Sequence, residues 1–237
     1  MKKISCICPT ANRPRFIAKS IELFLAQTYE DKELIIIDSG TPGVKWPDDP
    51  RVIHVVLGEK MTVGEKYRLG MTMADGEYMG IWDDDDWSGP ERLKRSIEQL
   101  ESNGVDAVGT TPILALIPRL RFAKWSQKTI DFWHNDKRGS WMPCSDNSLV
   151  WRRSKSRLGE PFGITMHMFE RMHRAGAKFM HIDNEGFFCY VRHPDVEWRD
   201  DWSALTDPIE RPAWIPDSMV EFWNQYTDAS QRYLSYL

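Results

Sequence analysis

The sequence predicts an α/β fold in which a mostly parallel central sheet is flanked by helices. The first observation is the order of apolar patterns in residues 1–82, where strand-like runs and helix-like spacing follow one another as in a doubly wound unit. The second is the run Glu33-Leu34-Ile35-Ile36-Ile37-Asp38, whose apolar middle suits a parallel strand that is covered on both faces.

Six elements account for this part of the chain. In order they are a strand over 4–8, a helix over 16–27, a strand over 33–38, a strand over 51–56, a helix over 62–74 and a strand over 77–82. The first helix is predicted from apolar residues at helical spacing, which are Phe16, Ile17, Ile21, Phe24 and Leu25. Cys6 and Cys8 lie two residues apart on the first strand, so they share one face of it.

Later elements follow from the same patterns. We expect a helix from Pro90, a strand starting at 149–151, a helix over 166–175, a strand over 178–182 and a closing helix within 219–237. Pro90 suits a helix start because its ring fixes a helical backbone angle. If the preceding acidic residues form only a solvated turn, Asp86 or Ser88 would be the N-cap of this helix.

Four consecutive aspartates over 83–86 follow the strand that ends at Trp82. Adjacent carboxylates repel one another, and the apolar flank over 78–82 makes uncompensated charge expensive. A bound divalent cation would reverse this cost, and hard oxygen ligands suit Mg²⁺ or Mn²⁺. In an extended segment Asp83 and Asp85 would share a target, whereas Asp84 would face elsewhere.

Three polar stretches, over 10–13, 38–40 and 83–86, come directly after predicted strands. Ligands of open α/β sheets bind beyond the carboxyl ends of the strands. We therefore expect the three stretches to form one site at the same rim. Asp38 taken alone would more commonly be a turn former or a helix cap.

The composition is that of a soluble globular protein, with 237 residues, 41% hydrophobic residues and a net charge of −4. No apolar run is long enough for a membrane span. Residues 1–3 lead directly into a short strand, which argues against a signal peptide. The four cysteines have no metal-type spacing, so we expect reduced thiols and a cytoplasmic protein.

The charge is distributed unevenly along the chain. Residues 1–116 carry −5, residues 117–157 carry +7 and residues 158–237 carry −6. The basic middle segment also contains six Phe and Trp residues. Basic side chains interleaved with aromatic rings suit a polyanionic acceptor such as hydroxymethylated DNA, an anionic lipid or a phosphosugar. A solvated charged face with its Trp residues in the core is the alternative.

Five segments resemble family-2 glycosyltransferases with the GT-A fold, a Rossmann-like α/β architecture. They are Ile7–Pro14, Gln27–Tyr29, Glu33–Gly40, Ala74–Met79 and Trp82–Trp87 with Pro90. The resemblance covers about the first hundred residues in order and spacing. It implies an enzyme that moves a hexosyl or pentosyl group from a nucleotide-sugar, with a UDP-sugar favoured, to an acceptor hydroxyl. It also implies Mn²⁺ or Mg²⁺ as cofactor.

The resemblance assigns roles to individual residues. Pro9, Ala11 and Arg13 would line the nucleotide pocket. Asp38 would accept a hydrogen bond from the base or ribose, and Lys66 would face the nucleotide or its phosphates. The Asp83-Asp84-Asp85 triplet matches the family's DXD motif, so Asp83 and Asp84 would contact the donor, and Asp83 and Asp85 the metal. Asp86 and His193, which follows Tyr190-Val191-Arg192, are further metal candidates, although His193 could equally be an ordinary loop residue.

Two departures from the family pattern concern the chemistry. Tyr67-Arg68 replaces the usual Arg-Asn pair, and Ile164-Thr165 stands where inverting members carry an acidic pair that includes the base. Asp146 and Glu170 are the substitutes for a general base that must reach the acceptor hydroxyl. An inverting mechanism is expected, but a retaining one would need no such base.

We divide the chain into a catalytic domain over 1–193 and a Trp-rich C-terminal extension over 194–237 that packs on the core. Within the domain, residues 1–100 would bind the donor and residues 101–193 the acceptor. A nucleotidyltransferase is one alternative, but the loop over 9–14 lacks the glycines of that class. A non-catalytic sugar- or nucleic-acid-binding module is another. The sequence does not predict an oligomeric state.

Overall fold

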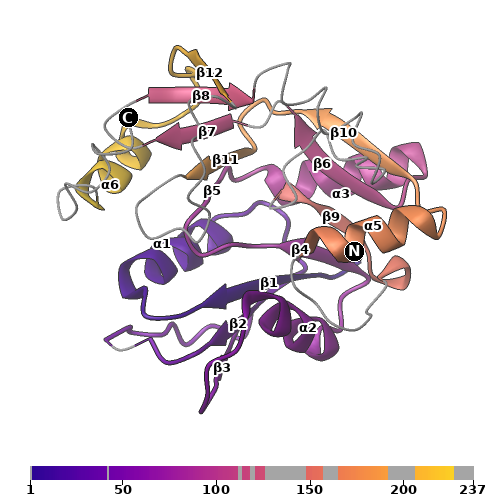
Figure 1. The fold of residues 1–237 in the computed structure, drawn as a ribbon, viewed down its shortest axis with the longest axis horizontal. Coiled ribbons are helices and arrows are strands. Elements are labelled where there is room, and N and C mark those ends of the chain that lie inside the picture. Colours follow the sequence, from indigo (N-terminus) through magenta and orange to yellow (C-terminus); the bar gives the residue numbers. More distant parts are fainter. Residues whose placement is uncertain are drawn as a thin grey trace.

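The computed structural model describes residues 2–41, 43–111, 114–117, 121–125, 148–156, 165–191 and 206–226. A seven-stranded sheet has the order β10-β6-β9-β4-β1-β2-β3 (Figure 1). Its strands are β1 (Ile4–Thr10), β2 (Lys32–Asp38), β3 (Val52–Val56), β4 (Tyr78–Ile81), β6 (Ala107–Thr111), β9 (Val150–Arg152) and β10 (Phe179–Asp183). β9 runs antiparallel between β4 and β6, while the other pairs are parallel. The predicted α/β fold with a mostly parallel central sheet is confirmed.

Helices cover both faces of this sheet because each strand alternates its side chains between two hydrophobic clusters. They are α1 (Pro14–Leu25), α2 (Val63–Met73), α3 (Arg92–Asn103) and α5 (Thr165–Arg174). Cys6 and Cys8 share a cluster with Ile17 of α1 and Leu93 of α3. Ile7, between the two cysteines, belongs to the cluster that contains residues of α2 and α5. The predicted common face of Cys6 and Cys8 is thus confirmed.

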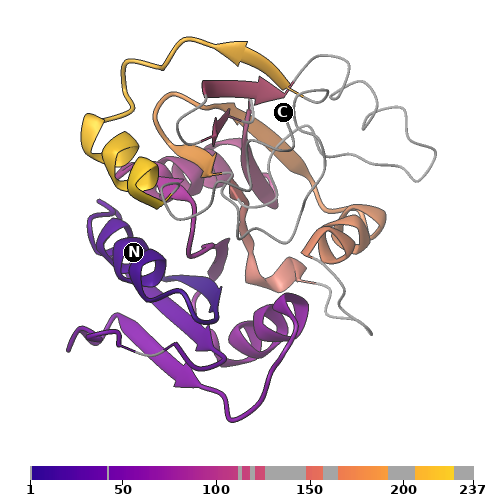
Figure 2. The ribbon, with the colours of Figure 1, turned by 60° about the vertical axis from the view of Figure 1, so that its left-hand side comes forward.

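A second, five-stranded sheet lies beyond the carboxyl ends of the first (Figure 1). Its strands, in the order β12-β8-β7-β11-β5, are β12 (Thr206–Ile209), β8 (Arg121–Trp125), β7 (Leu114–Ile117), β11 (Phe188–Val191) and β5 (Trp87–Ser88). Helix α6 (Asp217–Tyr226) lies beside α1 (Figure 2). Phe16, Trp87, Ile215 and Met219 share one cluster, so the 206–226 segment packs against α1 and the second sheet. The proposed division at residue 194 remains a prediction.

Several predicted boundaries shift by one or two residues, and neither Asp86 nor Ser88, the alternative N-cap residues, caps the helix. β1 continues to Thr10, which pairs with Asp38 of β2, so the strand is longer than residues 4–8. The helix after the acidic run begins only at Arg92, with Glu91 at the N-cap position and no side-chain cap. Ser88 instead accepts a hydrogen bond from Arg92, and the Asp86 carboxylate accepts one from Val191.

The described thiols Cys6, Cys8 and Cys189 are free and buried, and burial raises the pKa of Cys6 to about 12. These thiols are therefore inert packing groups. Among the residues with described structure, no helix combines the length and apolarity that a bilayer span requires.

Gly89 allows the acidic loop to pass close to the β10–β11 turn. A Cβ atom at this position would lie 2.0 Å from the backbone oxygen of Gly186. Because backbone cannot move aside as a flexible side chain does, Gly89→Ala is expected to cost about 2–3 kcal/mol of unfolding free energy. Urea denaturation measures this cost. Gly58→Ala is the matched control, since a Cβ there meets nothing within 4 Å. Equal losses in both variants would contradict the prediction.

Candidate functional site

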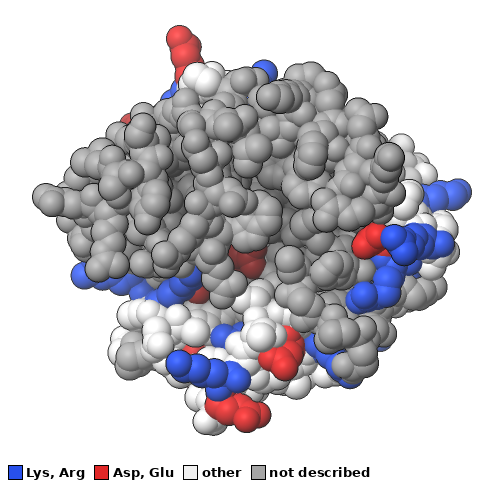
Figure 3. All heavy atoms as spheres, viewed as in Figure 1, with Lys and Arg blue, Asp and Glu red and all other residues white. Residues whose placement is uncertain are grey.

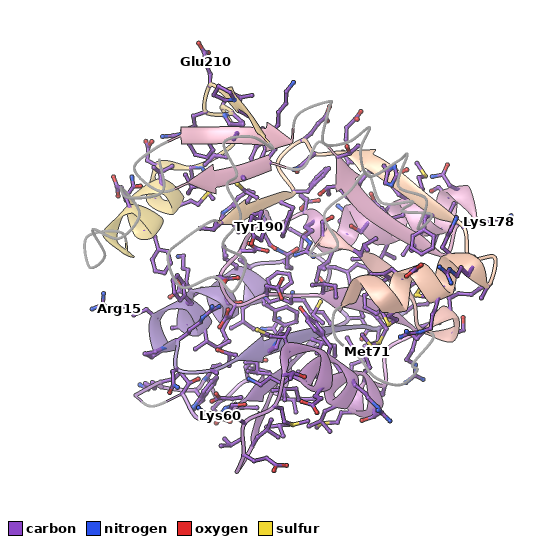
Figure 4. All side chains as sticks on the ribbon, viewed as in Figure 1. Arg15, Lys60, Met71, Lys178, Tyr190 and Glu210 are labelled. Atoms are coloured by element: carbon purple, nitrogen blue, oxygen red, sulfur yellow. The ribbon has the colours of Figure 1, made fainter. Side chains whose placement is uncertain are left out.

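The polar stretches that follow β1, β2 and β4 meet at one rim of the seven-stranded sheet. Thr10 is paired with Asp38 across β1 and β2, and the hydroxyl of Thr10 donates to Asp84 Oδ2 at 2.7 Å. Acidic atoms are visible in a recess near the middle of the face shown in Figure 3. Tyr190, on β11 of the second sheet, lies near the centre of the same view (Figure 4).

Arg13 joins two aspartates of the acidic loop. Its Nη1 atom donates to Asp84 Oδ1 at 2.9 Å and to Asp85 Oδ2 at 2.8 Å. Asp84 and Asp85 therefore share a partner, and the predicted separation of Asp84 from its neighbours is wrong. The physical reason is that residues 84–86 form a bend, so their side chains do not alternate as in an extended strand.

The electrostatics of this group follow from burial. Burial and the charge of Asp85 raise the pKa of Asp84 to about 6, while Arg13 and Thr10 act in the opposite direction. Burial would lower the pKa of Arg13, but Asp84 and Asp85 outweigh it and raise that pKa above its ordinary value. One guanidinium thus contacts two carboxylates, and it is shared between Asp84 and Asp85.

The two outer aspartates of the run differ in their surroundings. Asp83 is half-buried, and its Oδ1 atom accepts a hydrogen bond from the Tyr67 hydroxyl. Asp86 is buried, and its Oδ1 atom accepts from the Val191 amide at 2.9 Å. Asp86 therefore ties the acidic loop to β11. Its predicted role as a metal ligand stays a prediction.

The donor set fits a metal that shares its coordination with a substrate. Among the residues with described structure, no group of three or more His, Cys, Asp or Glu side chains is arranged to hold an ion. Mg²⁺ and similar hard cations commonly take one or two carboxylates and complete their coordination with water and substrate phosphates. Asp83 and Asp85 could supply those carboxylates.

Asp38 is the centre of a second polar group at the end of β2. It is 1% exposed, and it accepts from the Thr41 amide at 3.1 Å and from the Thr41 hydroxyl at 2.6 Å. His54 Nε2 lies 3.1 Å from Asp38 Oδ2, and the Trp46 ring stacks on His54 with centroids 3.5 Å apart. The turn-forming interpretation of Asp38 is thus observed, and its contact with a base or ribose stays a prediction.

The other predicted donor contacts lie at the end of β1. Lys66 is buried, and its Nζ atom donates to the backbone oxygen of Thr10 at 2.7 Å, while burial lowers its pKa. Pro9 is buried within β1, and Ala11 is half-buried directly after it. Lys66 thus supports the β1 end from α2, and its predicted contact with phosphates is untested.

The predicted general bases are not joined to this rim by the described contacts. Glu170 forms an ion pair with Arg174 one turn along α5. Asp146 lies outside the described residues, as does the metal candidate His193. Sequence reasoning did not identify Thr41, His54 or Trp46. The spacing of Thr41 from Asp38 is a turn signal that could have been recognised, whereas the Trp46–His54 stack depends on the path of a loop.

Comparison with known proteins identifies the family that the chain matches. Residues 5–159 match the family described as Glycosyl transferase family 2. The uncharacterized glycosyltransferase EpsJ from Bacillus subtilis (strain 168) is 32% identical over 115 residues, which cover 45% of this chain and 33% of EpsJ. The chain thus spans about a third of the length of that relative.

Two solved structures have the same fold at low sequence identity. S. aureus TarS 1-349 in complex with UDP-GlcNAc aligns with a TM-score of 0.62 and 12% identity, covering 82% of this chain and 60% of TarS 1-349. The mannosyltransferase PcManGT from Pyrobaculum calidifontis, in complex with GDP-Man and Mn²⁺, aligns with a TM-score of 0.56 and 18% identity, covering 81% of this chain and 56% of PcManGT. The predicted GT-A architecture is therefore confirmed at the level of the fold.

Proposed function

The chain belongs to glycosyl transferase family 2, and we propose that it transfers a sugar from a nucleotide-sugar donor to an acceptor hydroxyl in a metal-dependent reaction. The observation that carries this proposal is the convergence of Thr10, Asp38, Asp83 and Asp85 at the carboxyl ends of β1, β2 and β4. Open α/β sheets bind their ligands at this edge.

The acidic loop suits the charge that such a transfer creates. When the glycosidic bond to the donor phosphate breaks, negative charge develops on the departing nucleoside diphosphate. A bound Mn²⁺ or Mg²⁺ supplies positive charge at those phosphate oxygens. Asp85 would hold the ion, while Asp83, fixed by Tyr67, would hold the ion and the ribose. Fixed carboxylates need no rearrangement during the reaction, which favours catalysis.

The base of the donor would lie toward Asp38. His54 and Thr41 fix the carboxylate of Asp38, and Trp46 supports His54 by stacking. We favour a uridine nucleotide, as in TarS with UDP-GlcNAc, with the guanosine donor of PcManGT as the comparison. A thermal-shift panel of UDP- and GDP-sugars with Mn²⁺ tests this, because a bound ligand raises the melting temperature. A shift with GDP-sugars alone would overturn the uridine preference.

Tyr67→Phe tests the fixing of Asp83. A hydrogen bond to a charged group contributes about 1.5–3 kcal/mol, so the donor KM is expected to rise about tenfold or more. The loss of the same hydrogen bond should lower the melting temperature by roughly 3–12 °C, while the ring of Tyr67 keeps its packing in the cluster. Steady-state kinetics with varied donor concentration measures the effect. An unchanged KM would show that Tyr67 does not orient Asp83 for the donor.

For the acceptor we propose a polyanion, with hydroxymethylated DNA as the first candidate, bound through residues 117–157. Support comes from the +7 charge and interleaved aromatic residues of that segment. Filter binding of DNA across a salt series tests this proposal. We expect the affinity for DNA to fall steeply as the salt concentration rises. No affinity at low salt would exclude DNA.

We also propose that the transfer inverts the anomeric configuration of the sugar, with Asp146 or Glu170 as the general base. The anomeric configuration of the product tests this proposal.

Donor hydrolysis with Mn²⁺ separates the enzyme from its alternatives. A glycosyltransferase releases nucleoside diphosphate and free sugar slowly when water replaces the acceptor. A nucleotidyltransferase would instead release pyrophosphate from a nucleoside triphosphate and a sugar phosphate. A binding module would raise the melting temperature with donor but release no diphosphate, and this result would overturn the proposed activity.

A further inference from the structure

A single nitrogen of Arg13 is divided between a buried carboxylate and a carboxylate at the rim. Nη1 lies 2.9 Å from Asp84 Oδ1 and 2.8 Å from Asp85 Oδ2. The side chain of Asp84 is 3% exposed, that of Asp85 12% and that of Arg13 24%. Arg13 thus reaches from the protein interior to the carboxylate that we propose as a metal ligand.

Asp84 is built to keep Arg13 in place. Its Oδ2 atom accepts from the Thr10 hydroxyl at 2.7 Å, while its Oδ1 atom accepts from Arg13. Both oxygens are therefore engaged, and burial separates them from a solvated ion. Asp85 is different, because its Oδ2 atom receives Arg13 at the more exposed end of the group. The Arg13–Asp85 contact is consequently the more exposed of the two.

We propose that Arg13 competes with the divalent cation for Asp85, that Asp84 holds Arg13 in this position, and that metal binding thereby depends on the nucleotide. This inference rests on the proposed function, since it assumes that Asp85 is a metal ligand. Without nucleotide, the guanidinium repels an incoming cation and occupies the carboxylate that the cation needs. A diphosphate offers Arg13 another anionic partner and adds negative charge, so the cation then binds more tightly.

Two substitutions are expected to change metal affinity in opposite directions. Arg13→Gln removes the competing charge, so Mn²⁺ without nucleotide should bind about tenfold more tightly or better. Asp84→Asn weakens the attraction of position 84 for Arg13, so Arg13 should bind Asp85 more strongly and Mn²⁺ should bind more weakly than in the wild type. General damage to the site would weaken binding in both variants. Free Mn²⁺ is measured by electron paramagnetic resonance during titration, with and without UDP or GDP.

The double variant Arg13→Gln with Asp84→Asn completes the test. It buries no unpaired carboxylate at position 84, so it keeps the experiment informative if Arg13→Gln alone unfolds. Its affinity for Mn²⁺ should approach that of Arg13→Gln, and the nucleotide should strengthen Mn²⁺ binding less than in the wild type. Arg15→Gln is the matched control, because Arg15 is exposed on α1 and points away from the molecule (Figure 4).

Three other outcomes of the Mn²⁺ titrations would contradict the proposed competition between Arg13 and the cation. Wild-type affinity for Mn²⁺ in the double variant would overturn the role of Arg13. Weak binding in the double variant, equal to that of Asp84→Asn, would make Asp84 a direct ligand instead. If the wild type binds no Mn²⁺ even with UDP or GDP, the proposed metal site is wrong. The proposed competition is then wrong too, because it assumes that site. That result can be distinguished from failure of the competition alone, in which the wild type binds Mn²⁺ but replacing Arg13 does not change the affinity.

Discussion

Replacing Asp85 with asparagine will reduce donor hydrolysis by at least about 100-fold while leaving the fold intact. The Asp85 side chain is 12% exposed and lies at the rim where β1, β2 and β4 end. An amide of the same shape keeps the packing but cannot hold a divalent cation against the departing diphosphate. The stabilisation lost is therefore specific to the reaction. Release of nucleoside diphosphate from the donor with Mn²⁺ measures it.

Asp183→Asn is the matched control for this substitution. Asp183 is an exposed carboxylate at the end of β10, on the opposite edge of the sheet from β3. Its removal changes the net charge by the same amount, so unchanged hydrolysis would tie the loss in Asp85→Asn to the site. Equal rates for wild type and Asp85→Asn would instead end the assignment of Asp85 as a metal ligand.

The strands at the site were predictable because their signals are local. The predicted strand over 33–38 agrees with β2 to within one residue, since an apolar run between polar ends marks a strand covered on both faces. The position of the acidic loop follows from the same logic, because it comes directly after β4. Sequence could thus place Asp38 and the aspartates at one rim.

The division of roles among the aspartates could not be predicted. Asp86 is held by the amide of Val191, which lies 105 residues away in the sequence, so no local pattern marks the contact. Asp84 and Asp85 share Arg13 only because the chain bends between them, and the alternation of an extended strand gives the wrong answer. The insertion of β9 as an antiparallel strand is likewise a matter of long-range pairing.

Beneath the acidic loop lies a buried cation that sequence reasoning also missed. Arg92 is 1% exposed, and it donates from Nη1 to the Ser88 hydroxyl at 2.7 Å and from Nη2 to the Ile81 oxygen at 2.8 Å. Its guanidinium carbon lies 5.2 Å from the ring centroid of Trp82 and 5.0 Å from that of Phe188. Arg92 therefore connects the residues before and after the four aspartates and holds both ends of their loop.

Arg92→Ala is expected to lower the unfolding free energy by about 3–5 kcal/mol, because buried acceptors lose their donor and a cavity forms between two rings. For a chain of this size the melting temperature should fall by roughly 6–20 °C.

Arg92→Met restores most of the volume without the donors, so it should recover stability only in part and still weaken Mn²⁺ binding through a looser loop. Arg95→Ala, at an exposed position of the same helix, should change stability by no more than about 0.5 kcal/mol. Calorimetry and Mn²⁺ titration of the three variants separate these effects. Full metal affinity in Arg92→Met would show that the aspartates keep their geometry without this clamp.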